Sequence, residues 1–325
     1  MTNLYFAPME GITGHLYRTA HARVFGGADR YYAPFIYANP DGHIGGRDAE
    51  DLAPENNADL TLIPQILSND ADAFLATAAA LKSLGYEEVN LNLGCPSKKV
   101  SGRGRGAGFL ARPDELAVFL DKVYAQTPLA VSVKTRIGVS DEGEFEKLLE
   151  IFSRFPIAEL TIHPRLRDDY YTGPLHPAAW EKAAGALKMP LCYNGDLNTL
   201  ADFIHCMEST TAPAAVMIGR GALANPALFR MIRGGAPASI HEIRQLHDLL
   251  YAGYRSRISS ERKVLAILKE QWQFWRYLMR PEDQETVEQI LRTRLFSDYD
   301  RLTNDLFSSC KLLRESRYGH KIGVC

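Results

Sequence analysis

The 325-residue chain has a formal net charge of -2, a hydrophobic share of 46% and a charged share of 23%. These values are typical of a soluble globular protein and exclude disordered and collagen-like chains. No apolar run reaches the length of a membrane-spanning helix, and residues 1–8 lack the pattern of a signal peptide, so we expect a cytoplasmic protein without membrane contacts.

Eight short runs with the composition of β-strands occur in the first 235 residues, separated by helical stretches such as Ala71–Leu84 and Pro113–Tyr124. The runs are Leu4–Phe6, Tyr31–Phe35, Leu62–Ile66, Val89–Leu93, Ala130–Lys134, Glu159–Ile162, Leu191–Tyr193 and Ala215–Ile218. Eight strand–helix units predict an α/β fold of the TIM (β/α)8 barrel type. A Rossmann sheet is the alternative, but its glycine pattern occurs only around Gly102–Gly108, after the fourth run, where it is a weak signal.

Long helical patterns replace the strands from about Ser239 onward. They cover His241–Arg257, Glu261–Leu278 and a stretch from Glu285 to about Phe307. We therefore predict two domains, a barrel over residues 1–238 and an all-helical domain over residues 239–325. Residues 235–325 carry 15 Lys and Arg against 12 Asp and Glu, and the rest of the chain carries 22 against 27. This surplus of positive charge in the tail is weak support for nucleic-acid binding.

The five cysteines are odd in number, scattered and without C-x-x-C spacing, which argues against a disulfide framework and a zinc site. Cys95 stands apart because it lies in a Gly94-Cys95-Pro96 turn before the basic, glycine-rich segment 97–106. Since a thiol with a pKa near 8.5 is mostly protonated at neutral pH, Cys95 is suited to general-acid catalysis. Cys192, Cys206, Cys310 and Cys325 are expected to be structural.

Polar residues follow most of the strand runs, where the loops of a TIM barrel form the active site. They lie at residues 7–11, 65, 90–96, 134–136, 163–165, 194–196 and 219–221. Each residue also has a structural interpretation. In that interpretation, the Asn90 and Asn92 amides point into the barrel and bind each other or their neighbours. The aliphatic part of Lys134 packs against the core, and His163 makes a hydrogen bond without a part in catalysis. The turns after the seventh and eighth runs are either helix entries or a phosphate site.

Six ordered segments of this chain resemble the tRNA-dihydrouridine synthases, and the resemblance covers nearly the whole chain. The segments are Ala7-Pro8-Met9-Glu10-Gly11, the run from Asn92 to Val100, Val133-Lys134-Thr135-Arg136, His163-Pro164-Arg165, Asn194-Gly195-Asp196 and the run from Met217 to Gly221. The resemblance implies FMN as cofactor, NADPH as reductant and tRNA as partner. It also implies reduction of tRNA uridine to 5,6-dihydrouridine, with Cys95 as the proton donor.

Roles of further residues follow from the same resemblance. The residues expected to bind FMN are Pro8, Met9, Gln65, Lys134, His163, Asn194, Gly195, Asp196, Gly219 and Arg220. Those expected to contact uracil or RNA are Asn92, Lys98, Lys99, Arg103, Arg105, Arg165 and Lys269. We expect no metal and a monomer. The sequence departs from the family's pattern at Ala33-Pro34, Leu166 and Asp169, changes that bear on which uridine is selected.

Two other classes of protein stay open on the sequence. A flavin barrel that acts on a free pyrimidine also uses FMN and an active-site cysteine, but it has no need of the helical tail. A non-catalytic RNA-binding protein has no need of a flavin pocket.

Overall fold

The computed structural model describes residues 2–319, so Cys325 lies outside the described residues. These residues form two compact units. The first consists of Arg30–Gly195 with the segments up to Pro8 and from Ser209 to Met217, and the second of Met9–Asp29, Asp196–Glu208 and the chain from Ile218 onward. The expected boundary between residues 238 and 239 falls inside the second unit and stays a prediction.

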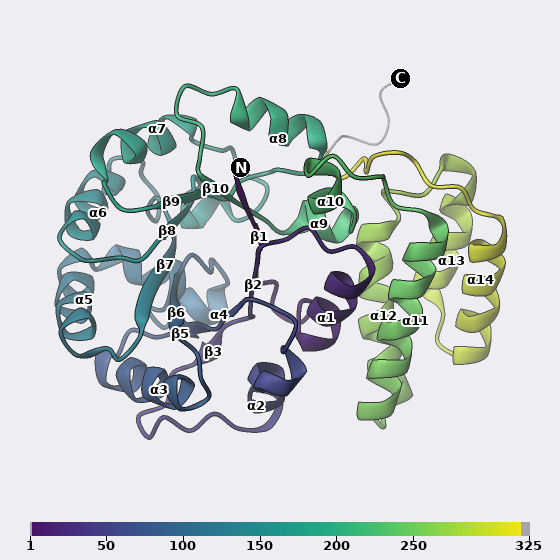
Figure 1. The fold of residues 1–325 in the computed structure, drawn as a ribbon, viewed down its shortest axis with the longest axis horizontal. Coiled ribbons are helices and arrows are strands. Elements are labelled where there is room, and N and C mark those ends of the chain that lie inside the picture. The colour runs from purple at the N-terminus through teal and green to yellow at the C-terminus, as the bar shows by residue number, and fades with distance from the viewer. Residues whose placement is uncertain (1, 320–325) are drawn as a thin grey trace. The chain divides into compact units, whose positions relative to one another are not determined.

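The strands form one ten-stranded sheet whose pairs are parallel (Figure 1). They are β1 (Asn3–Phe6), β2 (Arg30–Tyr32), β3 (Ile36–Tyr37), β4 (Leu62–Ile63), β5 (Gln65–Leu67), β6 (Glu88–Leu93), β7 (Ala130–Arg136), β8 (Leu160–His163), β9 (Leu191–Tyr193) and β10 (Ala215–Ile218). Their order is β3-β5-β6-β7-β8-β9-β10-β1-β2-β4.

The strand order begins with β3 and β5 and ends with β2 and β4, and these four strands come from only two runs of the chain. Strands β2 and β3 are one run interrupted around Pro34, and β4 and β5 are one run interrupted at Pro64. Proline cannot donate a backbone hydrogen bond, so it interrupts the pairing pattern without ending the run. Because β2 pairs with β4 and β3 pairs with β5, the ten segments make eight runs closed on themselves. The predicted TIM-barrel fold is confirmed.

Helices connect the strands of the first unit. They are α2 (Gly46–Leu52), α3 (Ala71–Ser83), α4 (Lys98–Ser101), α5 (Pro113–Gln126), α6 (Glu144–Ser153) and α7 (Pro177–Ala186). Helices α3, α5, α6 and α7 lie in that order on the outer side of the curled strands (Figure 1). Asp70 begins α3 by accepting the backbone N–H of Ala73 at 3.1 Å, as expected of an N-cap.

The interior of the barrel is filled by side chains that include Tyr5, Tyr32 and Cys192. Both tyrosine hydroxyls donate to the buried carboxylate of Glu159, at 2.9 and 3.3 Å. Cys192 is fully buried, which agrees with its expected structural role.

The second unit is helical. It contains α1 (His15–Val24), α8 (Leu200–Met207), α9 (Arg220–Ala224), α10 (Leu228–Ile232), α11 (Ile240–Arg257), α12 (Glu261–Trp275), α13 (Gln284–Arg292) and α14 (Phe296–Ser309). Helix α11 packs against α1, α12 and α14. The indole rings of Trp272 and Trp275 are buried, so these residues belong to the core of this unit.

The prediction of a single helical stretch from Glu285 to about Phe307 is wrong in one respect, because the structure divides this stretch into α13 and α14. Thr293 ends α13 in an extended conformation, and its hydroxyl donates to the carbonyl of Ile290 at 2.7 Å. Threonine hydroxyls compete with helical hydrogen bonding in this way. The sequence pattern of apolar residues continues across the break and conceals it.

No helix in the part of the chain from residue 2 to residue 319 is long and apolar enough to cross a membrane. Within the same residues, no cluster of three His, Cys, Asp or Glu side chains could hold a metal ion.

Candidate active site

Three buried amides form a ladder across neighbouring strands of the first unit. The Gln65 side chain donates to Asn90 Oδ1 at 2.8 Å and accepts from Asn92 Nδ2 at 2.7 Å. Asn90 in turn donates to Ser132 Oγ at 3.0 Å. The ladder follows the strand register, in which Gln65 lies opposite Asn90 and Asn90 opposite Ser132. Each amide therefore has the partners that burial requires, and its orientation is fixed.

Asn92 links this ladder to the turn that carries Cys95. Its side-chain oxygen accepts the backbone N–H groups of Gly94 and Cys95, both at 3.0 Å. This is the local turn geometry that asparagine favours. The amide of Asn92 thus fixes the backbone from which the half-buried Cys95 thiol projects at the carboxyl end of β6.

The chain returns to the same turn at Gly106. Ala107 donates its backbone N–H to the carbonyl of Cys95 at 3.0 Å. Gly106 has a φ of +55°, and a Cβ there would lie 2.9 Å from the Cys95 carbonyl oxygen. Only glycine allows this approach, so the basic loop between Cys95 and Gly106 is closed at its base.

Lys134 lies opposite Asn92 on the neighbouring strand β7. Its Nζ donates to Asn194 Oδ1 at 2.7 Å, and Asn194 Nδ2 donates to the carbonyl of Met217 at 2.7 Å. Burial, assisted by the positive charge of Arg136, lowers the pKa of Lys134 to about 8. The ammonium group therefore needs an anion or an electron-rich acceptor to remain charged well above neutral pH.

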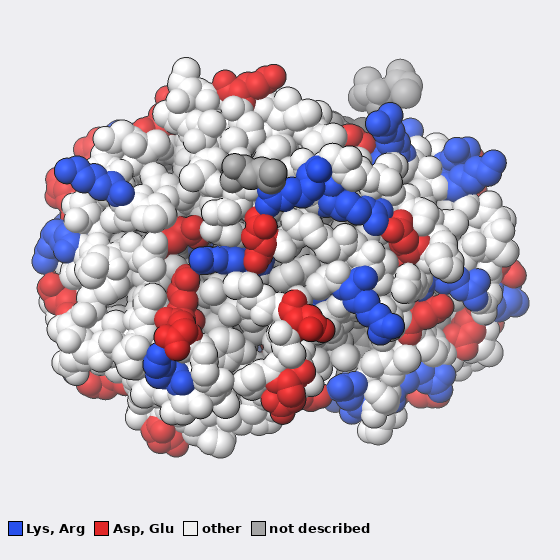
Figure 2. Space-filling model, in the orientation of Figure 1, with Lys and Arg blue, Asp and Glu red and all other residues white. Residues whose placement is uncertain are grey.

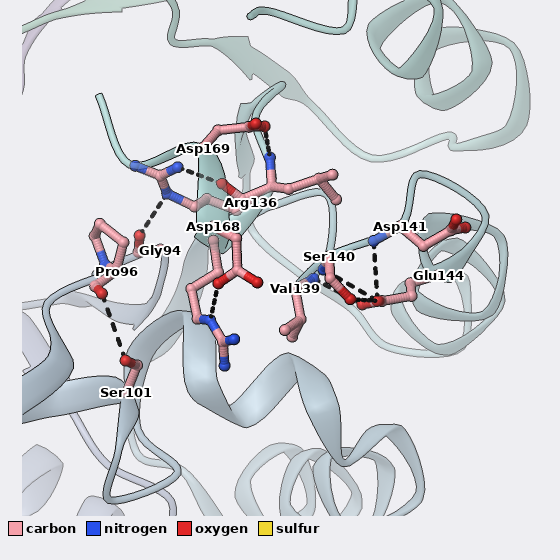
Figure 3. Close-up of polar contacts among 12 residues, drawn as sticks. Gly94, Pro96, Ser101, Arg136, Val139, Ser140, Asp141, Glu144, Asp168 and Asp169 are labelled. Carbon is pink, nitrogen blue, oxygen red and sulfur yellow. Dashed lines mark hydrogen bonds and ion pairs between the residues drawn. The ribbon is translucent and has the colours of Figure 1, made fainter. Parts of the chain in front are cut away.

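Arg136 connects the Cys95 turn to the loop that follows β8 (Figure 3). Its guanidinium donates to three carbonyls, those of Gly94 at 2.9 Å, Leu166 at 2.6 Å and Tyr170 at 2.5 Å. It also lies over the ring of Tyr171, 5.3 Å from the centroid. Burial lowers the pKa of Arg136 to about 10, and the three carbonyls and the ring satisfy the buried cation.

Asp169 and His176 hold the other side of that loop. One Asp169 oxygen accepts the N–H of Leu166 at 2.7 Å and contacts His176 Nε2 at 3.0 Å. His176 Nδ1 lies 2.8 Å from Glu142. Asp169 and Leu166, two of the departures from the family's pattern, are thus bound to each other in this loop.

His163 and Arg165 are both buried. Arg165 Nη1 lies 3.3 Å from His163 Nε2, and Arg165 Nε donates to the carbonyl of Gly173 at 2.8 Å. This geometry supports a role for Arg165 in shaping the loop, while its contact with substrate and that of His163 with FMN stay predictions.

Lys98, Lys99 and Arg103 have exposed side chains on the loop after Cys95, as a surface that meets RNA requires. Arg105 is half-buried. Its Nε donates to Asn69 Oδ1 at 3.2 Å, and its guanidinium lies over the ring of Tyr37 at 5.7 Å.

The second unit contains further residues that the sequence assigns to FMN and RNA. Met9 donates its N–H to Thr13 Oγ1 at 2.8 Å, and Arg220 donates to Asp196 Oδ1 at 2.9 Å. Asp196 has a φ of +40°, which is uncommon for a residue other than glycine. Lys269 donates to the carbonyl of Thr293 at 2.8 Å. The roles predicted for Met9, Asp196, Gly219, Arg220 and Lys269, like those of Pro8 and Gly195 in the first unit, stay predictions.

No sequence pattern assigns a role to Arg136, His176 or Tyr37. The signal for Arg136 was present, since it follows Lys134 with strand parity and lies at the same end of β7. The contacts of His176 depend on the fold of a loop, which no sequence pattern predicts.

The model of the family described as "Dihydrouridine synthase (Dus)" matches residues 5–256. The tRNA-dihydrouridine(16) synthase of Cupriavidus necator is 32% identical over 249 residues, which are 73% of this chain and 76% of that protein. The tRNA-dihydrouridine synthase B of Pasteurella multocida is 30% identical over 230 residues, covering 70% and 68%. The tRNA-dihydrouridine(16) synthase of Neisseria meningitidis serogroup B is 25% identical over 318 residues, which are 94% of each chain.

Solved structures of similar fold include an old yellow enzyme homologue from Zymomonas mobilis, with a TM-score of 0.52 and 14% identity over 72% of this chain and 89% of that chain. A morphinone reductase variant has a TM-score of 0.53 and 13% identity over 72% and 87%. These two structures bear on the fold alone. The family match and the relatives go further, and from them we conclude that the chain belongs to the dihydrouridine synthase family.

Proposed function

We propose that this protein reduces specific uridines of tRNA to 5,6-dihydrouridine, with FMN as cofactor, NADPH as reductant and the Cys95 thiol as proton donor. Membership of the family makes the chain an oxidoreductase enzyme. The single observation that carries the proposal is that Asn92, which lies opposite Lys134 in the strand register, accepts the backbone N–H of Cys95. A cytoplasmic, monomeric protein is part of the same proposal.

The polar groups of the first unit suit the edge of a flavin ring. Gln65, Lys134 and Asn194 each donate one N–H to a protein acceptor and keep at least one more for a ligand, and the strands fix the geometry of these groups. A cation with a depressed pKa, such as Lys134, gains most from an anionic or electron-rich neighbour. These residues therefore fit the cofactor, and reduced FMN, when bound, supplies the hydride for carbon 6 of uracil.

Cys95 completes the reduction by delivering its proton to carbon 5 of the same ring. Hydride and proton together saturate the carbon–carbon double bond, and the thiolate left behind regains a proton from solvent. Asn92 keeps the thiol at one place by fixing the Cys95 backbone, and Gly106 keeps the loop base close to it. Holding the acid in one place reduces the entropic cost of proton transfer.

RNA contacts are proposed for the exposed cations of the loop after Cys95. Figure 2 shows Lys and Arg side chains interspersed with Asp and Glu, so the face in view has no extended surface of positive charge alone. Lys98, Lys99 and Arg103 form such a group within a few residues of the thiol.

The test is to incubate the purified protein with FMN, NADPH and tRNA that lacks dihydrouridine, and to measure the modified base by mass. We expect dihydrouridine in the tRNA. Turnover on free uracil or orotate without product in tRNA would instead favour a free-pyrimidine dehydrogenase, and a protein that binds RNA without the flavin spectrum would favour a non-catalytic function.

A Cys95→Ala variant should bind flavin and lose about 10²- to 10⁴-fold in rate, the usual contribution of a general acid. The matched control is Cys206→Ala, which removes a half-buried thiol on α8. Full activity of Cys95→Ala would show that another group donates the proton.

A further inference from the structure

A cavity of about 290 Å³ lies at the loop that follows β3, with Tyr37, Asn39, His43 and Asp48 among its lining residues. Its volume lies just below the usual range of ligand sites, which is about 300–1,000 Å³. Such a volume suits a single flat ring system with its substituents better than a longer ligand.

The cavity lies at the same end of the strands as the proposed reaction. Tyr37 pairs in register with Leu67, two residues after Gln65, whose side chain holds Asn92. The carboxyl ends of parallel strands share one rim, so the lining of this cavity belongs to the rim that carries Cys95.

Arg105 joins the cavity to the loop of the thiol. Its guanidinium lies over the ring of Tyr37, while its Nε is bound to Asn69. The next residue, Gly106, is the one whose backbone packs against Cys95. Two consecutive residues of one loop, Arg105 and Gly106, therefore contact Tyr37 and the Cys95 turn respectively.

The chemistry of the lining selects an uncharged aromatic ligand. Tyr37 is 40% exposed, so the part of its ring that Arg105 and Phe35 do not cover is open to stacking. Asn39, His43 and Asp48 provide donors and acceptors for the edge of a base. The carboxylate of Asp48 repels phosphate, and the Arg105 cation is already held by Asn69 and the Tyr37 ring.

We propose that this cavity binds the nucleobase of a nucleotide next to the target uridine in the same RNA strand, stacked on Tyr37. The inference rests on the proposed function and extends it to a second base-binding site. By holding the neighbouring base, the site keeps the target uridine turned out of the RNA fold and toward Cys95. Bases splayed out of single-stranded RNA are recognised by aromatic rings and by contacts to their polar edges in this manner.

The first experiment measures steady-state dihydrouridine formation in tRNA by wild type, Tyr37→Ala and Tyr37→Phe. Tyr37→Ala should raise KM for tRNA about 5- to 100-fold, the effect of losing one base–aromatic stack, whereas Tyr37→Phe keeps the ring and stays near wild type. The control is Val118→Ala, which truncates an exposed apolar side chain on α5. A KM for Tyr37→Ala within twofold of that of Val118→Ala overturns the proposal.

The second experiment does not depend on turnover. An RNA hairpin with 2-aminopurine next to its uridine is titrated with each protein in the absence of NADPH. Wild type and Tyr37→Phe should quench the fluorescence by stacking, and Tyr37→Ala should not. Equal quenching by Tyr37→Ala and wild type rules out stacking on Tyr37. Wild-type protein that quenches the probe here but forms no dihydrouridine in the first experiment, with NADPH present, refutes the proposed reaction and leaves the base site supported.

Discussion

Asn92 accepts the backbone N–H of Cys95 at 3.0 Å, so a buried strand amide fixes the turn of the thiol. The same Asn92 side chain donates to Gln65, which in turn donates to Asn90. The backbone of the thiol is therefore held from the barrel side by Asn92 and Arg136, and from the loop side by the Ala107 N–H and the close approach of Gly106. Asn92 is therefore a positioning residue, and the proposed proton transfer belongs to Cys95.

Replacing Asn92 with Ala should reduce dihydrouridine formation by about 10²-fold, because misplacing a reacting group by about 1 Å has an effect of that size. Single-turnover reduction of tRNA by flavin-loaded, prereduced protein measures this directly. The control is Asn90→Ala, which removes a buried amide that binds Gln65 and Ser132 and reaches the Cys95 turn only indirectly, through Gln65 and Asn92. Both variants should lose about 1–3 kcal/mol of stability from unsatisfied partners. Equal rates in the two folded variants would refute the positioning role.

The barrel is predictable from the sequence because eight β-type runs alternate with helices, and Cys95 is predicted on the rim because it follows a strand. Shared strand parity also places Asn90 and Asn92 on one face, and the amide ladder has that arrangement. Strand parity places Arg136 at the same end of β7 as Lys134, but its contacts are not predictable, because its three acceptors are backbone carbonyls in two loops. Any residue supplies a carbonyl, so such contacts leave no trace in the sequence.

Lys134 makes the stability of the flavin-free protein depend on pH. Its pKa is lowered to about 8 in the folded state, while an unfolded lysine has a pKa near 10.4. Between these values the unfolded chain binds more protons, so this lysine makes stability rise with pH, by up to about 1.4 kcal/mol per pH unit. Below pH 8 both states are protonated, and the destabilising effect of burying the charge is complete.

The measurement compares urea unfolding of wild type and Lys134→Met at pH 7 and pH 9. The variant should be more stable than wild type at pH 7, and the difference should shrink at pH 9. A difference in stability that does not change between the two pH values would mean that Lys134 does not titrate in this range.

Lys98 and Lys99 are predicted to contact RNA phosphates from the loop after Cys95. A Lys98→Ala, Lys99→Ala double variant should weaken tRNA binding and reduce the slope of log affinity against log salt by about 1–2, since each phosphate contact releases about one counterion. Filter binding from 50 to 200 mM salt measures the slope. Lys147→Ala is the control, because this exposed lysine lies on α6 and pairs with Asp114. An unchanged slope in the double variant would remove both lysines from the RNA interface.

Arg136 should not tolerate replacement by lysine, although the charge is conserved. Its planar guanidinium reaches the carbonyls of Gly94, Leu166 and Tyr170 at once, and a lysine ammonium cannot match three such directions while lying over the ring of Tyr171. We expect Arg136→Lys to slow dihydrouridine formation by about 10-fold or more, through looser placement of the Cys95 turn. Limited proteolysis should cut the variant faster within residues 166–173, because that loop loses two of its anchors. The control Arg154→Lys changes an exposed arginine after α6 that pairs with Asp121. If Arg136→Lys is slow but its loop is as resistant as in this control, Arg136 acts on the substrate itself and not through the two loops that it joins.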